Sequence, residues 1–310
     1  MATAIPPLTE AEKLEYDDLD LGRNADTTRS TLIVASYNIR YAAGPFLISG
    51  GLLRKARLKT SQGRARAVAR NIHAVAEAFV SAKLLPRVDV LALQEADKET
   101  TRAGGWHVAR ELATELQMAW AHAPAGIPRG VKPKGRQWWL DFEEPIDLYD
   151  QGDTGVALLS RLPLTELTRI DLPWHECLWR PRLAMAATVG VGARSLRVFN
   201  VHVDPHSGAD GQLEQLEVIA EQAGAAAGPT IIVGDFNTLS KKKCFETRRF
   251  LEASGFTTPF RTGTPTWRGA GLRLHADWIF GRDLKITQWG VARPLKASDH
   301  WPIWGEIDLA

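Results

Sequence analysis

Acidic residues stand beside amide or imidazole side chains where apolar runs begin or end in this sequence. They fall into three groups: Asp235 with Asn237, Asp277, and Asp299 with His300. Carboxylate oxygens bind hard divalent cations, an amide holds a substrate oxygen, and an imidazole carries a proton. The pattern predicts a metal-assisted hydrolase whose site forms where strands end.

Three further strand-like apolar runs end on polar residues of the same kinds. They are 31–38 with Asn38, 88–94 followed by Glu95, and 195–203 with His202. Side chains two residues apart on an extended chain share one face, so Asp235 and Asn237 are expected to point the same way. The six groups together are expected to meet at one edge of a β-structure.

The ordered set of motifs resembles the endonuclease/exonuclease/phosphatase superfamily, which has the deoxyribonuclease I-like fold. The resemblance runs from about residue 32 to residue 307 and rests on Asn38, Gln94-Glu95, His202, Asp235-Phe236-Asn237, Asp277 and Ser298-Asp299-His300. It implies a four-layer αββα sandwich of two mixed β-sheets flanked by helices. It also implies a divalent-metal-dependent phosphoesterase that hydrolyses phosphodiester or phosphomonoester bonds.

The resemblance assigns metal binding to three residues. Glu95 is the implied primary ligand for Mg²⁺ or Mn²⁺, Asn38 is its neutral partner, and Asp299 is a second carboxylate on the metal side. Some nuclease relatives carry an acid two residues after the Asn38 position. Arg40 stands there in this chain, which leaves fewer carboxylates for the ion and favours a cation near a substrate phosphate.

The resemblance also assigns the catalytic roles. Asp235 is implied to orient or deprotonate the attacking water, while Asn237 and His202 contact phosphoryl oxygens. His300 is implied to lie beside the scissile phosphate, oriented by Asp277, because a carboxylate fixes the tautomer of an imidazole and raises its basicity. For His202 the alternative is a structural histidine, and for Asn237 a simple turn residue.

Tryptophan and histidine residues near these motifs allow further interpretations. Trp267 and Trp301 are candidates for a substrate-binding rim, since an indole stacks on a base or sugar, although most tryptophans belong to a core. His73, His107 and His122 fall on predicted helix or strand faces without an evident partner, so they are interpreted as structural.

Apolar periodicity predicts helices and strands in a mixed order. The predicted helices are 64–85, 105–118, 211–226 and 248–253, and the predicted strands are 31–38, 88–94, 154–159, 183–190, 195–203, 230–234, 273–280 and 300–307. The runs 183–190 and 195–203 meet around Gly192 and predict a hairpin. Two mixed sheets packed face to face, with helices outside, fit this order better than an alternating parallel sheet.

Length and composition favour one large enzymatic domain. The 310 residues are 45% hydrophobic, and 31–310 are expected to form one domain after a polar, acidic extension at 1–30. Two cysteines, Cys177 and Cys244, make a disulfide framework unsuited to this chain and favour a reducing compartment. We expect a monomer without a transmembrane segment, in the cytoplasm by default because no signal-type segment is visible.

The substrate is the least determined property. The net charge is only +2, but no acid occurs between Arg40 and Arg70, and this stretch contains Arg54, Lys55, Arg57, Lys59, Arg64 and Arg66. These cations favour a polyanion, and nucleic acid narrowly over a phospholipid, sphingomyelin or inositol phosphate; the alternative is a solvated helix face. The apolar stretch 42–48 is either an interfacial membrane contact or a buried loop.

Two other function classes fit the sequence less well than the phosphoesterase. A binding module that kept the fold and lost catalysis would be expected to lack Glu95, the Asp235–Asn237 pair or His300, and all of these are present. A serine hydrolase is disfavoured because the sequence has no Gly-x-Ser-x-Gly turn.

Overall fold

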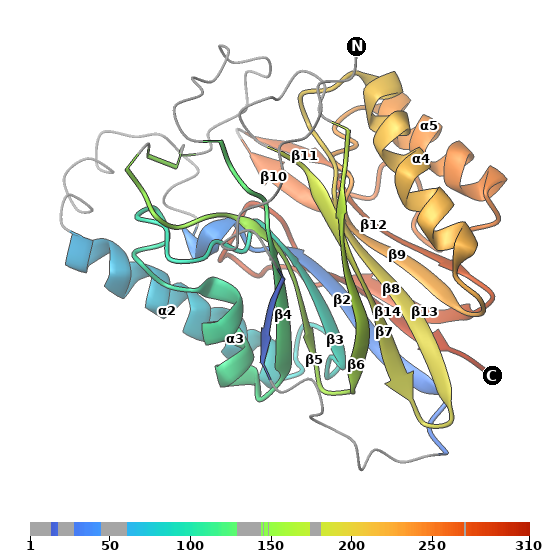
Figure 1. Cartoon of the computed structure of the whole chain (residues 1–310), viewed down its shortest axis with the longest axis horizontal. Coiled ribbons are helices and arrows are strands. Elements are labelled where there is room, and N and C mark those ends of the chain that lie inside the picture. Colours follow the sequence, from blue (N-terminus) through green and yellow to red (C-terminus); the bar gives the residue numbers. More distant parts are fainter. Residues whose placement is uncertain are drawn as a thin grey trace.

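Two β-sheets packed face to face form the centre of the protein, and helices cover their outer faces (Figure 1). This computed structural model describes residues 14–17, 28–44, 61–128, 144, 146–147, 149–173, 181–269 and 271–310. The predicted four-layer sandwich of mixed sheets is therefore confirmed.

The strands form a seven-stranded sheet, a five-stranded sheet and a small hairpin. The larger sheet has the order β1 (Glu15–Asp17), β4 (Ala119–Pro124), β5 (Gly155–Ser160), β3 (Val90–Gln94), β2 (Thr31–Asn38), β14 (Ile303–Asp308) and β13 (Lys285–Val291). The smaller sheet has the order β12 (Asp277–Arg282), β9 (Thr230–Asp235), β8 (Arg194–His202), β7 (Leu183–Val191) and β6 (Leu164–Asp171). The hairpin pairs β10 (Trp267–Gly269) with β11 (Leu272–Leu274).

In the described part of the chain, four long helices form the outer layers. They are α2 (Ser61–Val80), α3 (Val108–Leu116), α4 (Ala209–Ala225) and α5 (Lys241–Ala253). In Figure 1, α2 and α3 lie against the larger sheet, and α4 and α5 lie against the smaller one. No helix in the described part of the chain is both long enough and apolar enough to cross a membrane.

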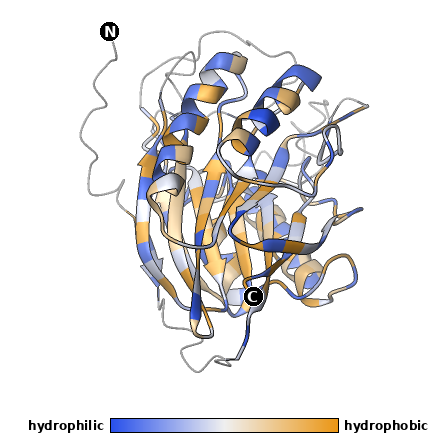
Figure 2. Cartoon of the chain, turned by 90° about the vertical axis from the view of Figure 1, so that its right-hand side faces the viewer, coloured by the Kyte–Doolittle hydropathy of each residue, from blue (hydrophilic) through white to orange (hydrophobic). Residues whose placement is uncertain are grey.

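Alternation along β2 shows how the sequence builds two cores. Leu32 and Val34 belong to the apolar cluster between the sheets, whereas Ala35 and Tyr37 belong to the cluster beneath α2 and α3. Side chains of a strand alternate between faces, so a strand buried on both sides must be apolar throughout. Figure 2 shows hydrophobic residues along the strands and hydrophilic residues on the outer surfaces of the helices.

Several predicted boundaries need correction. The helix predicted at 248–253 begins at Lys241, where Ser240 accepts a hydrogen bond from the Lys243 amide and caps the first turn. The run 273–280 is split between β11 and β12. The edge strand β1 lies within the segment expected to be an extension. The hairpin around Gly192 is confirmed, because β7 and β8 pair antiparallel on either side of it.

The basic stretch is only partly described. Arg54, Lys55, Arg57 and Lys59 lie outside the described residues, as does 45–48 of the apolar stretch. Arg64 lies on α2 and forms a bidentate ion pair with Glu144, at 2.9 and 3.0 Å. Its charge is therefore balanced within the protein, contrary to the interpretation of Arg64 as a phosphate contact.

Candidate active site

Strand register brings three predicted site residues into one row. On the smaller sheet, β8 runs parallel to β9 with His202 opposite Asp235, and β12 runs antiparallel to β9 with Asp277 opposite the same Asp235. Asp235 therefore lies between His202 and Asp277 on adjacent strands. All three side chains are buried: His202 is 5% exposed, and Asp235 and Asp277 are each 1% exposed.

The side-chain amide of Asn38 joins this row to the larger sheet. Asn38 and Gln94 are paired at the ends of the parallel strands β2 and β3, and Glu95 follows directly. The Asn38 Nδ2 donates to Glu95 Oε1 at 3.1 Å and to Asp235 Oδ2 at 2.9 Å. Carboxylates from opposite sheets thus share one donor, which fixes their separation.

The backbone turns sharply where the site residues leave their strands. Arg40, Glu95 and Asn237 have left-handed φ values of 47°, 50° and 51°. This conformation costs an ordinary residue roughly 1–2 kcal/mol. At Gly234 the φ is +149°, and a Cβ would lie 2.1 Å from the carbonyl oxygen of Val201, so only glycine fits before Asp235.

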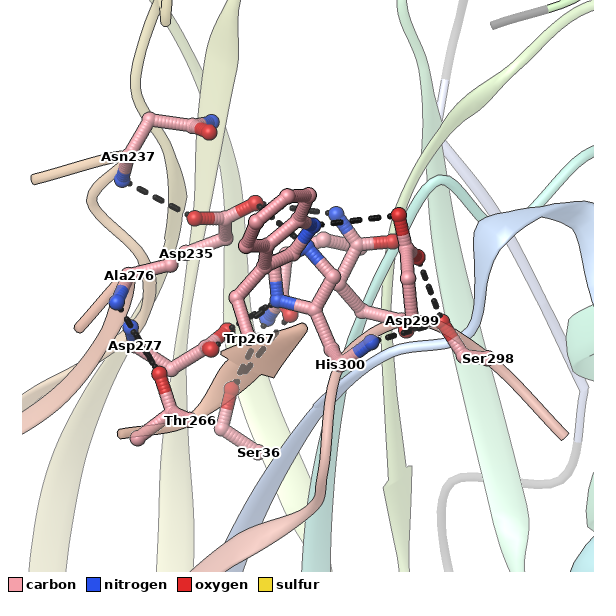
Figure 3. A network of polar contacts seen from close by, with 12 residues as sticks. Ser36, Asp235, Asn237, Thr266, Trp267, Ala276, Asp277, Ser298, Asp299 and His300 are labelled. Atoms are coloured by element: carbon pink, nitrogen blue, oxygen red, sulfur yellow. Dashed lines mark hydrogen bonds and ion pairs between the residues drawn. The ribbon is translucent and has the colours of Figure 1, made fainter. Parts of the chain in front are cut away.

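His300 and Asp277 form a buried hydrogen-bonded pair (Figure 3). The His300 Nδ1 lies 2.9 Å from Asp277 Oδ2, and Thr266 Oγ1 accepts the backbone N–H of Asp277 at 2.9 Å. Burial alone would lower the pKa of His300, but the carboxylates of Asp277 and Asp235 outweigh it and raise the pKa to about 10. The imidazole is therefore protonated at neutral pH.

Asp235 is the central carboxylate of the cluster. Its Oδ2 lies 3.8 Å from His300 Nε2 and 3.7 Å from His202 Nε2, and its Oδ1 accepts the Asn237 amide at 2.9 Å. Burial raises its pKa, and Asp277 adds to this while His300 and Asn38 oppose it; the pKa is about 7. Asp235 is therefore a carboxylate poised to take a proton near neutrality.

Asp299 is held by donors from three other residues. Its Oδ2 accepts from Arg40 Nη1 at 2.5 Å and from Trp267 Nε1 at 3.0 Å, and its Oδ1 accepts from Ser298 Oγ at 3.1 Å. The Ser298 hydroxyl also lies 2.8 Å from the Asn38 carbonyl oxygen, which ties this segment to the end of β2. The carboxylate predicted as a metal ligand is thus paired with a buried guanidinium.

The acids of the site differ in their suitability for a metal ion. Asp235, Asp277 and His300 place ligand-type atoms within 4.8 Å of one another, so the cluster can hold a divalent ion. The protonation of His300 disfavours it as a ligand at neutral pH. The side chain of Glu95 is 14% exposed, against 9% for Asp299 and 1% for Asp235. Glu95 is the carboxylate that an ion from solvent reaches most readily.

Arg182 is a site residue that the sequence analysis missed. Its Nη1 lies 2.9 Å from His202 Nε2, and the residue is only 4% exposed. Its Nε and Nη2 have no hydrogen-bond partner within the described residues. The basic residue precedes β7, far from every recognised motif in sequence, and only the β7–β8 pairing brings it to His202.

The two predicted rim tryptophans are buried, at 5% exposure each. The indole N–H of Trp267 donates to Asp299. The ring of Trp301 is contacted by two guanidinium groups, with the Cζ atoms of Arg268 and Arg293 at 5.2 and 4.8 Å from its centroid. At this burial neither indole offers an exposed ring face for stacking, and their place in a substrate-binding rim stays a prediction.

A buried neutral histidine beside the site makes stability depend on pH. The pKa of His275 is lowered to about 3 by burial, which outweighs its 3.1 Å contact with the Asp277 carbonyl oxygen. In the unfolded chain the imidazole of His275 takes up a proton below about pH 6.5, whereas in the folded protein it stays neutral down to about pH 3. The free energy of unfolding should therefore fall by about 1.4 kcal/mol per pH unit from this residue between about pH 6.5 and 3.

Urea unfolding at pH 7.5, 6.0 and 5.0 tests this linkage. Below pH 6.5, the free energy of unfolding of the His275→Gln variant is expected to change less steeply with pH than that of the wild type. The difference in slope should be about 1.4 kcal/mol per pH unit, which corresponds to one proton. Equal slopes in the wild type and the His275 variant would contradict a neutral, buried His275.

Comparison with known proteins agrees with this geometry. The model of the Endonuclease/Exonuclease/phosphatase family matches residues 10–300. The chain belongs to this family. A UPF0294 protein of Photorhabdus laumondii is 30% identical over 209 residues, which cover 63% of this chain and 75% of that protein.

Solved structures share the fold at low sequence identity. An endonuclease/exonuclease/phosphatase from Beutenbergia cavernae superposes with a TM-score of 0.63 at 17% identity, covering 91% of this chain and 72% of that one. ANGEL2, a 2′,3′-cyclic phosphatase in complex with adenosine-2′,3′-vanadate, superposes with a TM-score of 0.58 at 13% identity, covering 96% and 99%.

Proposed function

We propose that the protein is a divalent-metal-dependent phosphoesterase that hydrolyses a phosphodiester or phosphomonoester bond by in-line attack of water. The supporting observation is the position of Asp235, a buried carboxylate between two imidazoles that shares the Asn38 amide with Glu95. This arrangement separates a base from a protonated acid within one small cluster, as hydrolysis near neutral pH requires.

Asp235 would act as the base. Its Oδ1 and Oδ2 are held by the Asn237 amide and the Asn38 side chain, so the carboxylate has a fixed orientation. In its ionised form it accepts a proton from the attacking water as that oxygen bonds to phosphorus; the P–O bond to the leaving group breaks, and the leaving oxygen takes a proton from solvent. Fixed orientation matters because general base catalysis needs the acceptor within hydrogen-bond reach of the reacting proton.

His300 would supply positive charge to the reacting phosphoryl group. Asp277 holds the Nδ1 side of the ring, which leaves the Nε2 side directed towards Asp235 and the site. A protonated imidazole there stabilises negative charge as it develops on phosphoryl oxygens. Asn237 and His202 are proposed as further contacts to these oxygens.

Arg182 would bind the phosphoryl group through its Nε and Nη2 groups, which have no hydrogen-bond partner among the described residues. A guanidinium fork matches two phosphate oxygens, which an ammonium group cannot do. Replacing Arg182 by methionine should lower the turnover number by about 10²–10³. Steady-state kinetics would check this, and Arg182→Lys should recover only part of the loss; full activity in Arg182→Met would contradict the assignment.

The charges of the site fit one divalent ion at Glu95, with Asn38 as its neutral neighbour. Asp299 is balanced by Arg40, so it is proposed to hold that guanidinium rather than a second ion. An oxygen-rich site favours Mg²⁺ or Mn²⁺ over softer metals. When bound, such an ion neutralises phosphoryl charge and lowers the barrier to attack.

Unpaired cations next to the site favour a polyanionic substrate, with nucleic acid preferred to a lipid head group. Arg268, Arg273, Arg293 and Lys296 form no ion pair with any residue that the structure describes, whereas Arg64, Arg102 and Arg169 elsewhere are paired with carboxylates. Arg268 borders the site, because its amide donates to the Asp299 carbonyl oxygen, and Arg273 is its cross-strand partner on β11. Arg293 lies over the ring of Trp301, the residue after His300. The phosphates along a nucleic-acid strand can neutralise such a group of cations.

A substrate panel tests the proposal. The purified protein would be assayed with Mg²⁺ on DNA, RNA, sphingomyelin, inositol phosphates and a bis-aryl phosphodiester, with Asp235→Asn as the matched inactive control. Hydrolysis of at least one phosphoester by the wild type alone is expected, with nucleic acid preferred. No hydrolysis of any phosphoester, or equal rates in the control, would refute the proposed function.

A further inference from the structure

A second group of potential metal ligands lies at the β1 edge of the larger sheet. It consists of Glu15 on β1, His107 at the start of α3, and His122 on β4, and their ligand-type atoms all lie within 4.8 Å of one another. The Oε2 of Glu15 is 3.5 Å from Nε2 of His107. Such spacing suits donors that share one small cation. His107 and His122 therefore do have close neighbours, contrary to the expectation that they lie without an evident partner.

Both histidines are buried and each directs a ring nitrogen into this group without a hydrogen bond. His107 is 1% exposed and His122 is 0% exposed. The nitrogens concerned, Nε2 of His107 and Nδ1 of His122, have no hydrogen-bond partner in the described part of the chain. Buried polar atoms are almost always satisfied, so two adjacent exceptions indicate a missing ligand.

The other ring nitrogens are anchored by backbone groups. The Nε2 of His122 lies 2.8 Å from the Ala96 carbonyl oxygen, so it carries the proton and leaves the Nδ1 lone pair for the group. This is the arrangement by which proteins orient metal-binding imidazoles. The Nδ1 of His107 accepts from the Arg110 amide at 3.3 Å and caps α3. The Trp120 ring closes the other side, 4.8 Å from the His107 ring.

Burial keeps the two imidazoles neutral. Burial lowers the pKa of His107 to about 3, and the neighbouring His122, Arg110 and Lys98 add to this effect. Burial also lowers the pKa of His122, to about 4. Neutral imidazoles are the form that binds metals. Lys98 pairs with the second carboxylate oxygen of Glu15 and leaves Oε2 facing the histidines.

We propose that Glu15, His107 and His122 bind a transition-metal ion of the Zn²⁺ type, which fastens β1 to β4 and to the start of α3. Two imidazoles and one carboxylate favour Zn²⁺, Co²⁺ or Ni²⁺ over the Mg²⁺ expected at Glu95. Metal binding at Nε2 of His107 needs the neutral tautomer with its proton on Nδ1, so the proton shifts from Nε2 to Nδ1 and the 3.3 Å hydrogen bond from the Arg110 amide is lost. Three protein ligands leave the fourth position to water.

Calorimetric titration with Zn²⁺, in the presence of excess Mg²⁺ to occupy the catalytic site, tests this inference. Glu15→Gln removes a half-exposed ligand, and His107→Asn removes the imidazole while keeping a side chain that caps helices well. The wild type is expected to bind one more Zn²⁺ than either variant. When free Zn²⁺ is about 100 times its dissociation constant for this site, the unfolding equilibrium constant of the wild type should fall by about 100-fold. Neither variant should show this fall.

Two control variants separate this site from others. His73→Asn disrupts an exposed histidine–glutamate pair with Glu115, and Glu95→Gln alters the proposed catalytic ion site. Both should keep the extra Zn²⁺, and Co²⁺ bound there should give a visible spectrum that Glu15→Gln and His107→Asn lose. Equal Zn²⁺ stoichiometry in all five proteins, or loss of the extra ion in His73→Asn, would overturn the proposal.

Discussion

Replacing Asp235 by asparagine is expected to reduce the turnover number on a phosphodiester by about 10²–10⁴. Asparagine has the same shape and can still accept the Asn237 amide, so folding should be preserved, but it cannot take a proton from water. Burial raises the pKa of Asp235 to about 7, so the wild-type rate should rise with pH as this carboxyl ionises and level off above it. The Asp235→Asn profile should lack this rise.

Steady-state rates measured between pH 5 and 9 check both statements. Circular dichroism and the melting temperature of the variant provide the control for folding. An Asp235→Asn enzyme with wild-type turnover would exclude Asp235 as the base. A wild-type rate that falls as pH rises towards neutrality would also exclude it, since the ionised carboxylate is the active form.

Replacing His300 by alanine is expected to lower turnover by roughly 10² or more. The substitution removes the imidazole that is proposed to face the phosphoryl group, and the 2.9 Å contact with Asp277 disappears with it. Asp277→Asn should also reduce turnover, because it weakens the charge that keeps the pKa of His300 raised. Since the two residues act as one unit, the double variant should be little worse than His300→Ala alone.

Single-turnover rates on the same phosphodiester would measure these three variants beside the wild type. The His73→Ala variant serves as a matched control, because His73 is an exposed histidine that pairs only with Glu115 among the described residues. Normal turnover in His300→Ala would contradict the proposed mechanism. Multiplicative losses in the double variant would instead show that His300 and Asp277 act separately.

The sequence predicted the sheet core well because its signals were local. Asn38, Glu95, His202 and Asp235 each end an apolar run, and a buried strand is apolar along its length. Parallel pairing of β2 with β3, and of β8 with β9, then brings these ends to one edge. Strands with mixed exposure, such as β13 and β6, lacked such a run and were not predicted.

Contacts between distant elements were beyond reach of the sequence. The ion pair of Arg40 with Asp299 joins residues 259 positions apart, and no local pattern distinguishes Arg40 from a solvent-exposed cation. The same holds for Arg182, whose partner His202 is fixed by strand register. Burial of Trp267 also depends on the bridge to His300. The sequence therefore identified which residues could react, but not which charges balance them.

A titration of metal-stripped protein with Mg²⁺, read as hydrolysis of a bis-aryl phosphodiester, tests the central claim most directly. The account predicts no turnover in the presence of chelator, saturable recovery with Mg²⁺ in the wild type, and little or no recovery in Glu95→Gln. Full turnover in chelator, or a Glu95→Gln variant with the same Mg²⁺ dependence as the wild type, would contradict it.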